Sequence, residues 1–199
     1  MYAYFRRWEA DGTWEAVAGA VRRDLRVELG RDPEPSAAIM DSQTVKTTEQ
    51  GGPRGYDGGK RTNGRKRHYL VDTEGLLLEL VVHAAKLSEG AGAKLLLAKA
   101  KAALRRLQKI WVDQGYKAGV VEWAQVEVGY LLEVVAREAG TKGFKLLPRR
   151  WVVERSIAWI GRYRRMSKEY EALTETSEAM IWAAFGITML RRLVKLRAS

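Results

Sequence analysis

The chain of 199 residues contains no cysteine and only two histidines, and it lacks a long hydrophobic run. Without thiols, neither disulfides nor thiolate-bound zinc can form. A metal site would therefore depend mainly on carboxylate oxygens, which favour Mg²⁺ or Mn²⁺. The longest uncharged stretch near the C-terminus, residues 179–190, is shorter than the roughly 20 residues that cross a bilayer. Residues 1–14 are polar and aromatic, unlike an apolar leader. We expect a cytoplasmic protein with no membrane contact.

Basic residues are in excess, giving a net charge of +11, and the excess is concentrated in two segments. Residues 54–67 and residues 145–168 each contain a single acidic residue, Asp57 and Glu154 respectively. Charge that serves solubility alone has no reason to concentrate in this way. The pattern therefore predicts a polyanionic partner, with nucleic acid as the first candidate.

Apolar periodicity and turn signals predict a mixed α/β fold. Residues 1–32 read as a partial helical N-terminal region, interrupted at Asp11-Gly12 and followed by a proline-containing linker. Residues 36–199 read as one domain, with residues 49–67 as a long, glycine-rich basic loop. The predicted strands are 37–40, 68–71, 76–82, 110–112 and 131–135, and the predicted helices are 91–107, 116–128, about 149–165 and 176–196.

Two aspartates, Asp41 and Asp113, each follow a short apolar run that reads as a strand. Ligands bind at strand ends in open α/β sheets, because side chains leave the core there. Two aspartates on adjacent strands would repel each other unless a cation neutralised them. The alternative for either residue alone is a structural role as a loop or helix cap.

A third carboxylate, Glu154, lies on a predicted helix. At about 100° per residue, Arg150, Glu154 and Arg165 share one face of that helix, and Arg155 and Arg162 lie beside it. The alternative interpretation is a simple ion pair between Arg150 and Glu154, four residues apart. Three carboxylates on two strands and a helix would suffice for two-metal phosphoryl transfer.

Four sequence segments together resemble the DDE transposases of the insertion-sequence-five family, within the wider group related to insertion sequence four. The resemblance extends from Tyr4 to Leu193. The segments contain, in order, the first aspartate, a glycine-rich basic loop, the second aspartate and the glutamate helix: residues 40–46, 51–68, 111–116 and 147–165.

This resemblance implies a ribonuclease-H-like mixed sheet flanked by helices, with Asp41, Asp113 and Glu154 as catalytic residues and as ligands of two Mg²⁺ (or Mn²⁺) ions. It implies cleavage at the ends of a mobile element and strand transfer by attack of a 3′-hydroxyl. The partners would be double-stranded DNA, both terminal inverted repeats and target, and the protein would be associated with the nucleoid. Paired ends suggest a homodimer. The expected DNA-contacting residues are Lys46, Arg54, Lys60, Arg61, Arg65, Lys66, Arg67, Arg150, Arg155, Arg162 and Arg165.

The sequence departs from the wider group's pattern at three places. A tyrosine is expected at the position of Leu147 and a lysine at that of Gly161, which leaves Arg162 or Arg165 to replace the lysine. The N-terminal helical region is also short, as if an upstream polypeptide from an overlapping frame supplied the remainder. Two further hypotheses therefore stay open: an inactive or truncated DNA-binding remnant, and a ribonuclease-H-like nuclease that cuts without joining.

Overall fold

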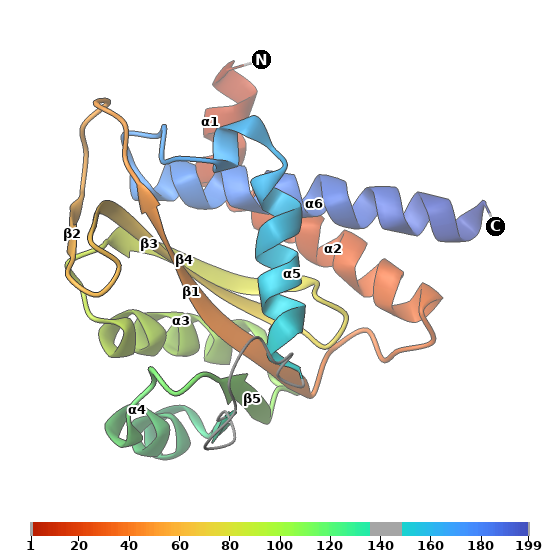
Figure 1. Cartoon of the computed structure of the whole chain (residues 1–199). Coiled ribbons are helices and arrows are strands. Elements are labelled where there is room, and N and C mark those ends of the chain that lie inside the picture. Colours follow the sequence, from red (N-terminus) through yellow and green to blue (C-terminus); the bar gives the residue numbers. More distant parts are fainter. Residues whose placement is uncertain (1, 136–148, 199) are drawn as a thin grey trace.

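The computed structural model describes residues 2–135 and 149–198, and these form one six-stranded sheet with helices on both faces (Figure 1). The strands are β1 (Ala37–Lys46), β2 (Gly55–Asp57), β3 (Thr62–Asp72), β4 (Leu77–Ala84), β5 (Lys109–Val112) and β6 (Leu131–Val134). The helices are α1 (Tyr2–Ala10), α2 (Thr13–Glu28), α3 (Glu89–Ala103), α4 (Ala118–Trp123), α5 (Arg150–Gly161) and α6 (Thr174–Arg197). A π-helical turn, Ala124–Val128, extends α4, and a 3₁₀ turn, Arg164–Met166, follows α5.

The sheet is antiparallel in one half and parallel in the other. Strand β3 pairs antiparallel with β1 on one side, and with β4 and the short β2 on the other. Strands β1, β5 and β6 are parallel neighbours. This curled mixed sheet flanked by helices confirms the predicted ribonuclease-H-like fold.

Alternation along β1 divides the core into two layers, because successive side chains in a strand point to opposite faces. Ala38 and Met40 pack in the cluster that includes α3 and α4. Ile39 packs in the other cluster, to which α2, α5 and α6 contribute. Figure 1 shows α3 and α4 on one side of the sheet and α2 and α6 on the other. Among the described residues no helix is both long and apolar enough to cross a bilayer.

Local sequence explains where several helices begin and end. Helix α3 begins after Ser88, whose side chain accepts a hydrogen bond from the Ala91 amide at 3.2 Å, as an N-cap should. The chain leaves α2 through Gly30, whose φ of 69° suits glycine far better than other residues. Helix α2 then packs along α6, so the N-terminal region and the sheet domain share one core.

The stacked histidine pair, His68 on β3 and His83 on β4, lies under α3 with its ring centroids 5.0 Å apart. Gly92 faces the pair, and a Cβ atom at this position would overlap the Nε2 atoms of both rings. Burial lowers the pKa of His68 to about 3, and the neighbouring His83 adds to this effect. Burial also lowers the pKa of the half-buried His83, so both histidines are neutral near neutral pH.

Several predicted segments differ in extent from the observed ones, and two of these differences affect the motifs. The glycine-rich segment 49–67 is only partly a loop, because it contains β2 and the first residues of β3. The predicted helix ending near Arg165 stops at Gly161, and Arg165 lies in the 3₁₀ turn. Leu147 and Pro148, at the start of the glutamate-helix motif, lie outside the described residues.

Candidate active site

Asp41 and Asp113 occupy equivalent positions on neighbouring parallel strands. Ile39 of β1 is in register with Trp111 of β5, and each aspartate follows two residues later. Asp113 comes directly after the end of β5, as predicted, whereas Asp41 lies in the middle of β1, which continues to Lys46. Because side chains alternate with a period of two, both aspartates are expected on the sheet face of Ile39 and Trp111, the face to which α5 contributes.

The ionisation of Asp41 reflects this proximity. Burial raises the pKa of Asp41 to about 6, and the charge of Asp113 adds to the rise. The Ser42 amide, which donates to Asp41 Oδ1 at 2.7 Å, and the charges of Arg150 and Lys60 oppose it. Two carboxylates thus share one neighbourhood with two cationic side chains.

Helix α5 carries both Glu154 and Arg150, and Arg150 links Glu154 to Asp113. The Arg150 Nη2 atom lies 3.4 Å from Glu154 Oε1 and 3.9 Å from Asp113 Oδ2. The intrahelical ion pair considered from the sequence therefore forms, and the same nitrogen also reaches the second aspartate. Since both carboxylates approach one nitrogen atom, the oxygens of Glu154 and Asp113 can be no farther apart than the sum of these two distances.

Helix α5 is held over the sheet by the turn between β3 and β4. Ser156 donates a hydrogen bond to the Gly75 carbonyl at 2.8 Å, and Gly75 has a φ of 81°. A Cβ atom at Gly75 would lie 2.6 Å from Ser156 Oγ, so only glycine permits this approach. Val153 and Ile160 of the same helix are buried in the core, whereas Glu154 is exposed.

As placed, the acidic side chains do not surround a single ion. Among the described residues, no three His, Cys, Asp or Glu side chains lie close enough to hold a metal ion. Arg150 instead provides the positive charge between Asp113 and Glu154. The donor set nevertheless fits a hard divalent cation, since it offers only carboxylate oxygens and concentrates charge that a cation would neutralise.

Two residues that the sequence reasoning did not select, Glu89 and Tyr116, also border this site. Glu89, the first residue of α3, accepts a hydrogen bond from Ser42 Oγ at 3.2 Å and lies 3.6 Å from Lys60 Nζ. Tyr116 is buried close to Asp41, Glu89 and Asp113. An acidic residue in the first turn of a helix is ordinary capping chemistry, so its sequence carried no special signal.

The family model described as "Transposase DDE domain" matches residues 32–190, from the linker before β1 into α6. The chain belongs to the transposase DDE domain family. A transposase acts on DNA, and enzymes of this family generally use divalent metal ions. Comparison with curated proteins gave no match.

Three of the transposase's predicted DNA contacts are buried, which corrects the prediction for them. Arg65 and Arg67 are 0% and 1% exposed, and Lys66 is 4% exposed. Both arginines pair with the buried Glu169, and Lys66 pairs with Asp57 at 3.3 Å. These side chains point into the protein, where they cannot reach a DNA backbone.

We call Arg65, Arg67 and Glu169 the buried arginine cluster. Its two guanidinium groups also donate to the backbone carbonyls of Pro53, Met166, Lys168, Ala172 and Leu173. The Ser177 hydroxyl donates to Glu169 Oε1 at 2.9 Å. The cluster thereby fastens the segment between α5 and α6 to β3 and to the loop before β2.

Two other predicted contacts of the transposase are engaged by neighbouring side chains. The Arg155 guanidinium stacks on the rings of Trp151 and Trp159, 4.4 Å and 4.6 Å from their centroids, and donates to the Glu74 carbonyl at 3.1 Å. Arg165 pairs with Glu171 at 2.5 Å. Arg155 is thus a packing residue of α5, and Arg165 is exposed but partly neutralised.

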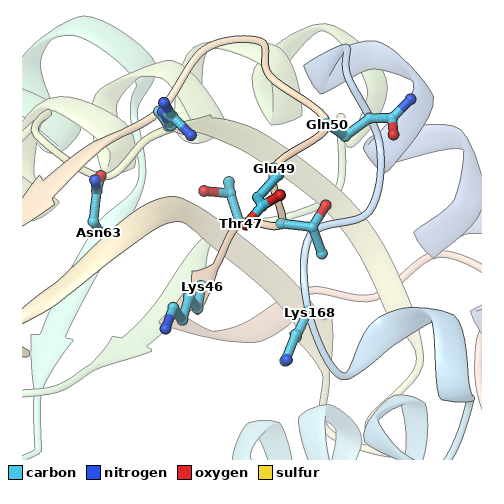
Figure 2. A pocket seen from close by; sticks show the side chains of 8 residues that line it. Lys46, Thr47, Glu49, Gln50, Asn63 and Lys168 are labelled. Atoms are coloured by element: carbon cyan, nitrogen blue, oxygen red, sulfur yellow. The ribbon is translucent and has the colours of Figure 1, made fainter.

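The remaining predicted contacts, Lys46, Arg54, Lys60, Arg61 and Arg162, are exposed. Lys46 and Arg54 line an open groove at the far end of β1, with a volume of about 740 Å³. Figure 2 shows Lys46 and Lys168 extending side by side at this groove. We call it the basic groove, lined by Lys46, Thr47, Thr48, Glu49, Gln50, Arg54, Asn63 and Lys168.

Proposed function

We propose that this chain is a transposase of the insertion-sequence-five family that cleaves the ends of its mobile element and joins them to target DNA. Asp41, Asp113 and Glu154 are proposed to hold two Mg²⁺ or Mn²⁺ ions. The observation that carries the proposal is the Arg150 nitrogen shared by Asp113 and Glu154, beside the equivalent position of Asp41 on the next strand. These contacts support the proposal that residues 41, 113 and 154, which are far apart in the chain, act together.

Bound divalent ions would activate the attacking hydroxyl and stabilise the leaving oxygen of the phosphodiester. The protein's own contribution is orientation. Arg150 is only half-buried and carries a planar guanidinium, so it can exchange a carboxylate for the phosphate of an incoming strand and bind it through two donors. Lys60 is a second cation near Asp41, and its ammonium donates to the carbonyl of the adjacent Ser42 at 3.1 Å.

The exposed basic residues would position the duplex. Lys46 lies five residues beyond Asp41 on β1, about 17 Å away at the usual rise per strand residue. Lys46, Arg54 and Lys168 in the basic groove can therefore contact backbone phosphates several base pairs from the cut, while Arg162 lies at the end of α5. Contacts of this kind set register and affinity without reading sequence.

The resemblance to the insertion-sequence-five family supplies the finer part of the proposal. The DNA would be terminal inverted repeats and target, two copies would hold paired ends, and the protein would act at the nucleoid. These features rest on the four motifs given above.

The test is a cleavage and joining assay on a labelled duplex carrying the inverted repeat that flanks the gene. Wild type with Mg²⁺ should produce nicks at the repeat end and joined products. Asp113→Asn should abolish both while still binding the duplex, and Asp24→Asn, an exposed aspartate on α2, should leave both unchanged. Nicks without joined products would indicate a nuclease, and binding without nicks a remnant. Normal cutting by Asp113→Asn would contradict the site assignment.

A further inference from the structure

The carboxylate of Glu89 approaches the site from the α3 side of the sheet. It lies at the N-terminus of α3 and contacts Ser42, the residue that follows Asp41, as well as Lys60. Glu89 is thus tied by its contacts to the part of β1 that carries Asp41.

Gly115 shows that Glu89 and Asp113 border the same small space. A Cβ atom at Gly115 would lie 3.0 Å from Asp113 Oδ1 and 3.0 Å from Glu89 Oε2. Two negatively charged oxygens therefore face one point from two sides. The Lys60 Nζ atom lies 3.6 Å from the other oxygen of Glu89, and the Gly115 amide donates to Asp113 Oδ1 at 2.9 Å. Only the lack of a side chain at Gly115 keeps the space open.

The Tyr116 hydroxyl supplies an independent indication of a ligand. It is buried and, among the described residues, has no hydrogen-bond partner. Burial, followed by the charges of Asp41, Glu89 and Asp113, raises the pKa of Tyr116 well above its usual value, so the hydroxyl is a proton donor facing three acids. The neighbouring Ser42 side chain opposes the rise. A buried donor without a partner is costly, which points to a bound group that completes its contacts.

We propose that Glu89 is a fourth acidic residue of the metal site and helps to hold a divalent cation on the Asp113 side, with Tyr116 donating a hydrogen bond to the oxygens around it. This inference rests on the proposed metal-dependent function. The simpler role for Glu89 would be stabilisation of the α3 N-terminus through the helix dipole. That role predicts a change in stability only, whereas the proposal predicts a change in metal affinity.

The experiment is a Mn²⁺ titration of the full chain without DNA, followed by electron paramagnetic resonance of the free ion. Glu89→Gln removes the charge and keeps the shape. We expect a loss of Mn²⁺ affinity of about 10-fold or more, the scale found for residues that support a metal site. Asp113→Asn should lose at least as much. Glu175→Gln is the matched control, because Glu175 is an exposed acid in the first turn of α6, and it should stay within about twofold of wild type by the same scale.

A second variant tests the same proposal even if Glu89→Gln does not fold. Gly115→Ala changes no charge but inserts a methyl group into the space between Asp113 and Glu89, and it too should weaken Mn²⁺ binding. If Asp113→Asn lowers the affinity but Glu89→Gln and Gly115→Ala do not, the fourth acid is excluded while the proposed function stands. If wild type binds no Mn²⁺, or Asp113→Asn binds it as well as wild type, both proposals fail.

Discussion

Replacing Glu169 with glutamine should cost the protein a large part of its stability, although Glu169 is far from the proposed chemistry along the sheet. Glu169 is 1% exposed and is the carboxylate partner of both guanidinium groups in the buried arginine cluster. Glutamine preserves the volume and one acceptor oxygen. It leaves two buried positive charges facing a neutral group, so the change isolates the electrostatic contribution.

The size of the effect follows from burial. Removing one partner of a buried ion pair costs about 3–5 kcal/mol, because the remaining charge stays desolvated. Arg65 and Arg67 keep their backbone carbonyl acceptors, which places the expected loss nearer the lower figure. For a chain of this length, 1 kcal/mol lowers the melting temperature by roughly 2–4 °C, so the midpoint should fall by on the order of 10 °C.

The assay is urea and thermal unfolding followed by circular dichroism. Glu171→Gln is the matched control, since Glu171 pairs with the exposed Arg165 and should contribute no more than about 1 kcal/mol. A loss below about 1 kcal/mol for Glu169→Gln would refute the reasoning, because that is the range of surface pairs.

Three further outcomes follow from the structure. Gly92→Ala should lower the free energy of unfolding in urea by about 1–3 kcal/mol or more, because the added methyl group overlaps the stacked histidine pair. Gly186→Ala is the control and should not destabilise the fold, because its added Cβ atom would lie 3.6 Å from the nearest atom, an ordinary contact. Burial raises the pKa of Glu79 from 4.5 to about 7. Between these pH values the native state keeps a proton that the unfolded chain releases. The contribution of this proton to the free energy of unfolding is therefore fully present below pH 4.5 and is lost as the pH rises through about 7. Glu79→Gln should flatten that dependence in urea titrations at a series of pH values, and an unchanged slope would exclude Glu79 as its source. Arg54→Gln should weaken duplex binding for all sequences alike and reduce the salt slope of log K by about 1; an unchanged slope would remove Arg54 from the DNA contacts.

The fold could be predicted from the sequence because local signals and global arrangement agree. The short apolar strand before Asp113 is confirmed as β5, and the turn at Asp72–Gly75 is confirmed between β3 and β4. The extent of β3 could not be predicted. Its residues 62–67 contain one glycine and three basic side chains, and such a run of charge usually indicates a solvated loop. They form a strand because Glu169, about a hundred residues later, neutralises the inward-facing arginines.

For the candidate site, too, the sequence predicts some residues and not others. Motif resemblance selected Asp41, Asp113 and Glu154, and the pairing register and the Arg150 contacts then showed how the two strands and α5 approach one another. Glu89 could not be selected, because a glutamate after a serine N-cap is typical of any helix start. A run of charged residues does not indicate which side chains are buried, so the sequence predicts the same exposure for Arg65 and Arg67 as for Arg61, although only Arg61 is exposed.

The most direct test is a crystal structure of the full chain with Mn²⁺ and a DNA end, in which anomalous scattering locates the ions. We expect ions bridged by the oxygens of Asp41, Asp113 and Glu154 at about 2.1 Å, with the Arg150 guanidinium moved from Asp113 to a DNA phosphate. Ions bound elsewhere, with Arg150 still paired to Glu154 and Asp113, would contradict the three-carboxylate metal site.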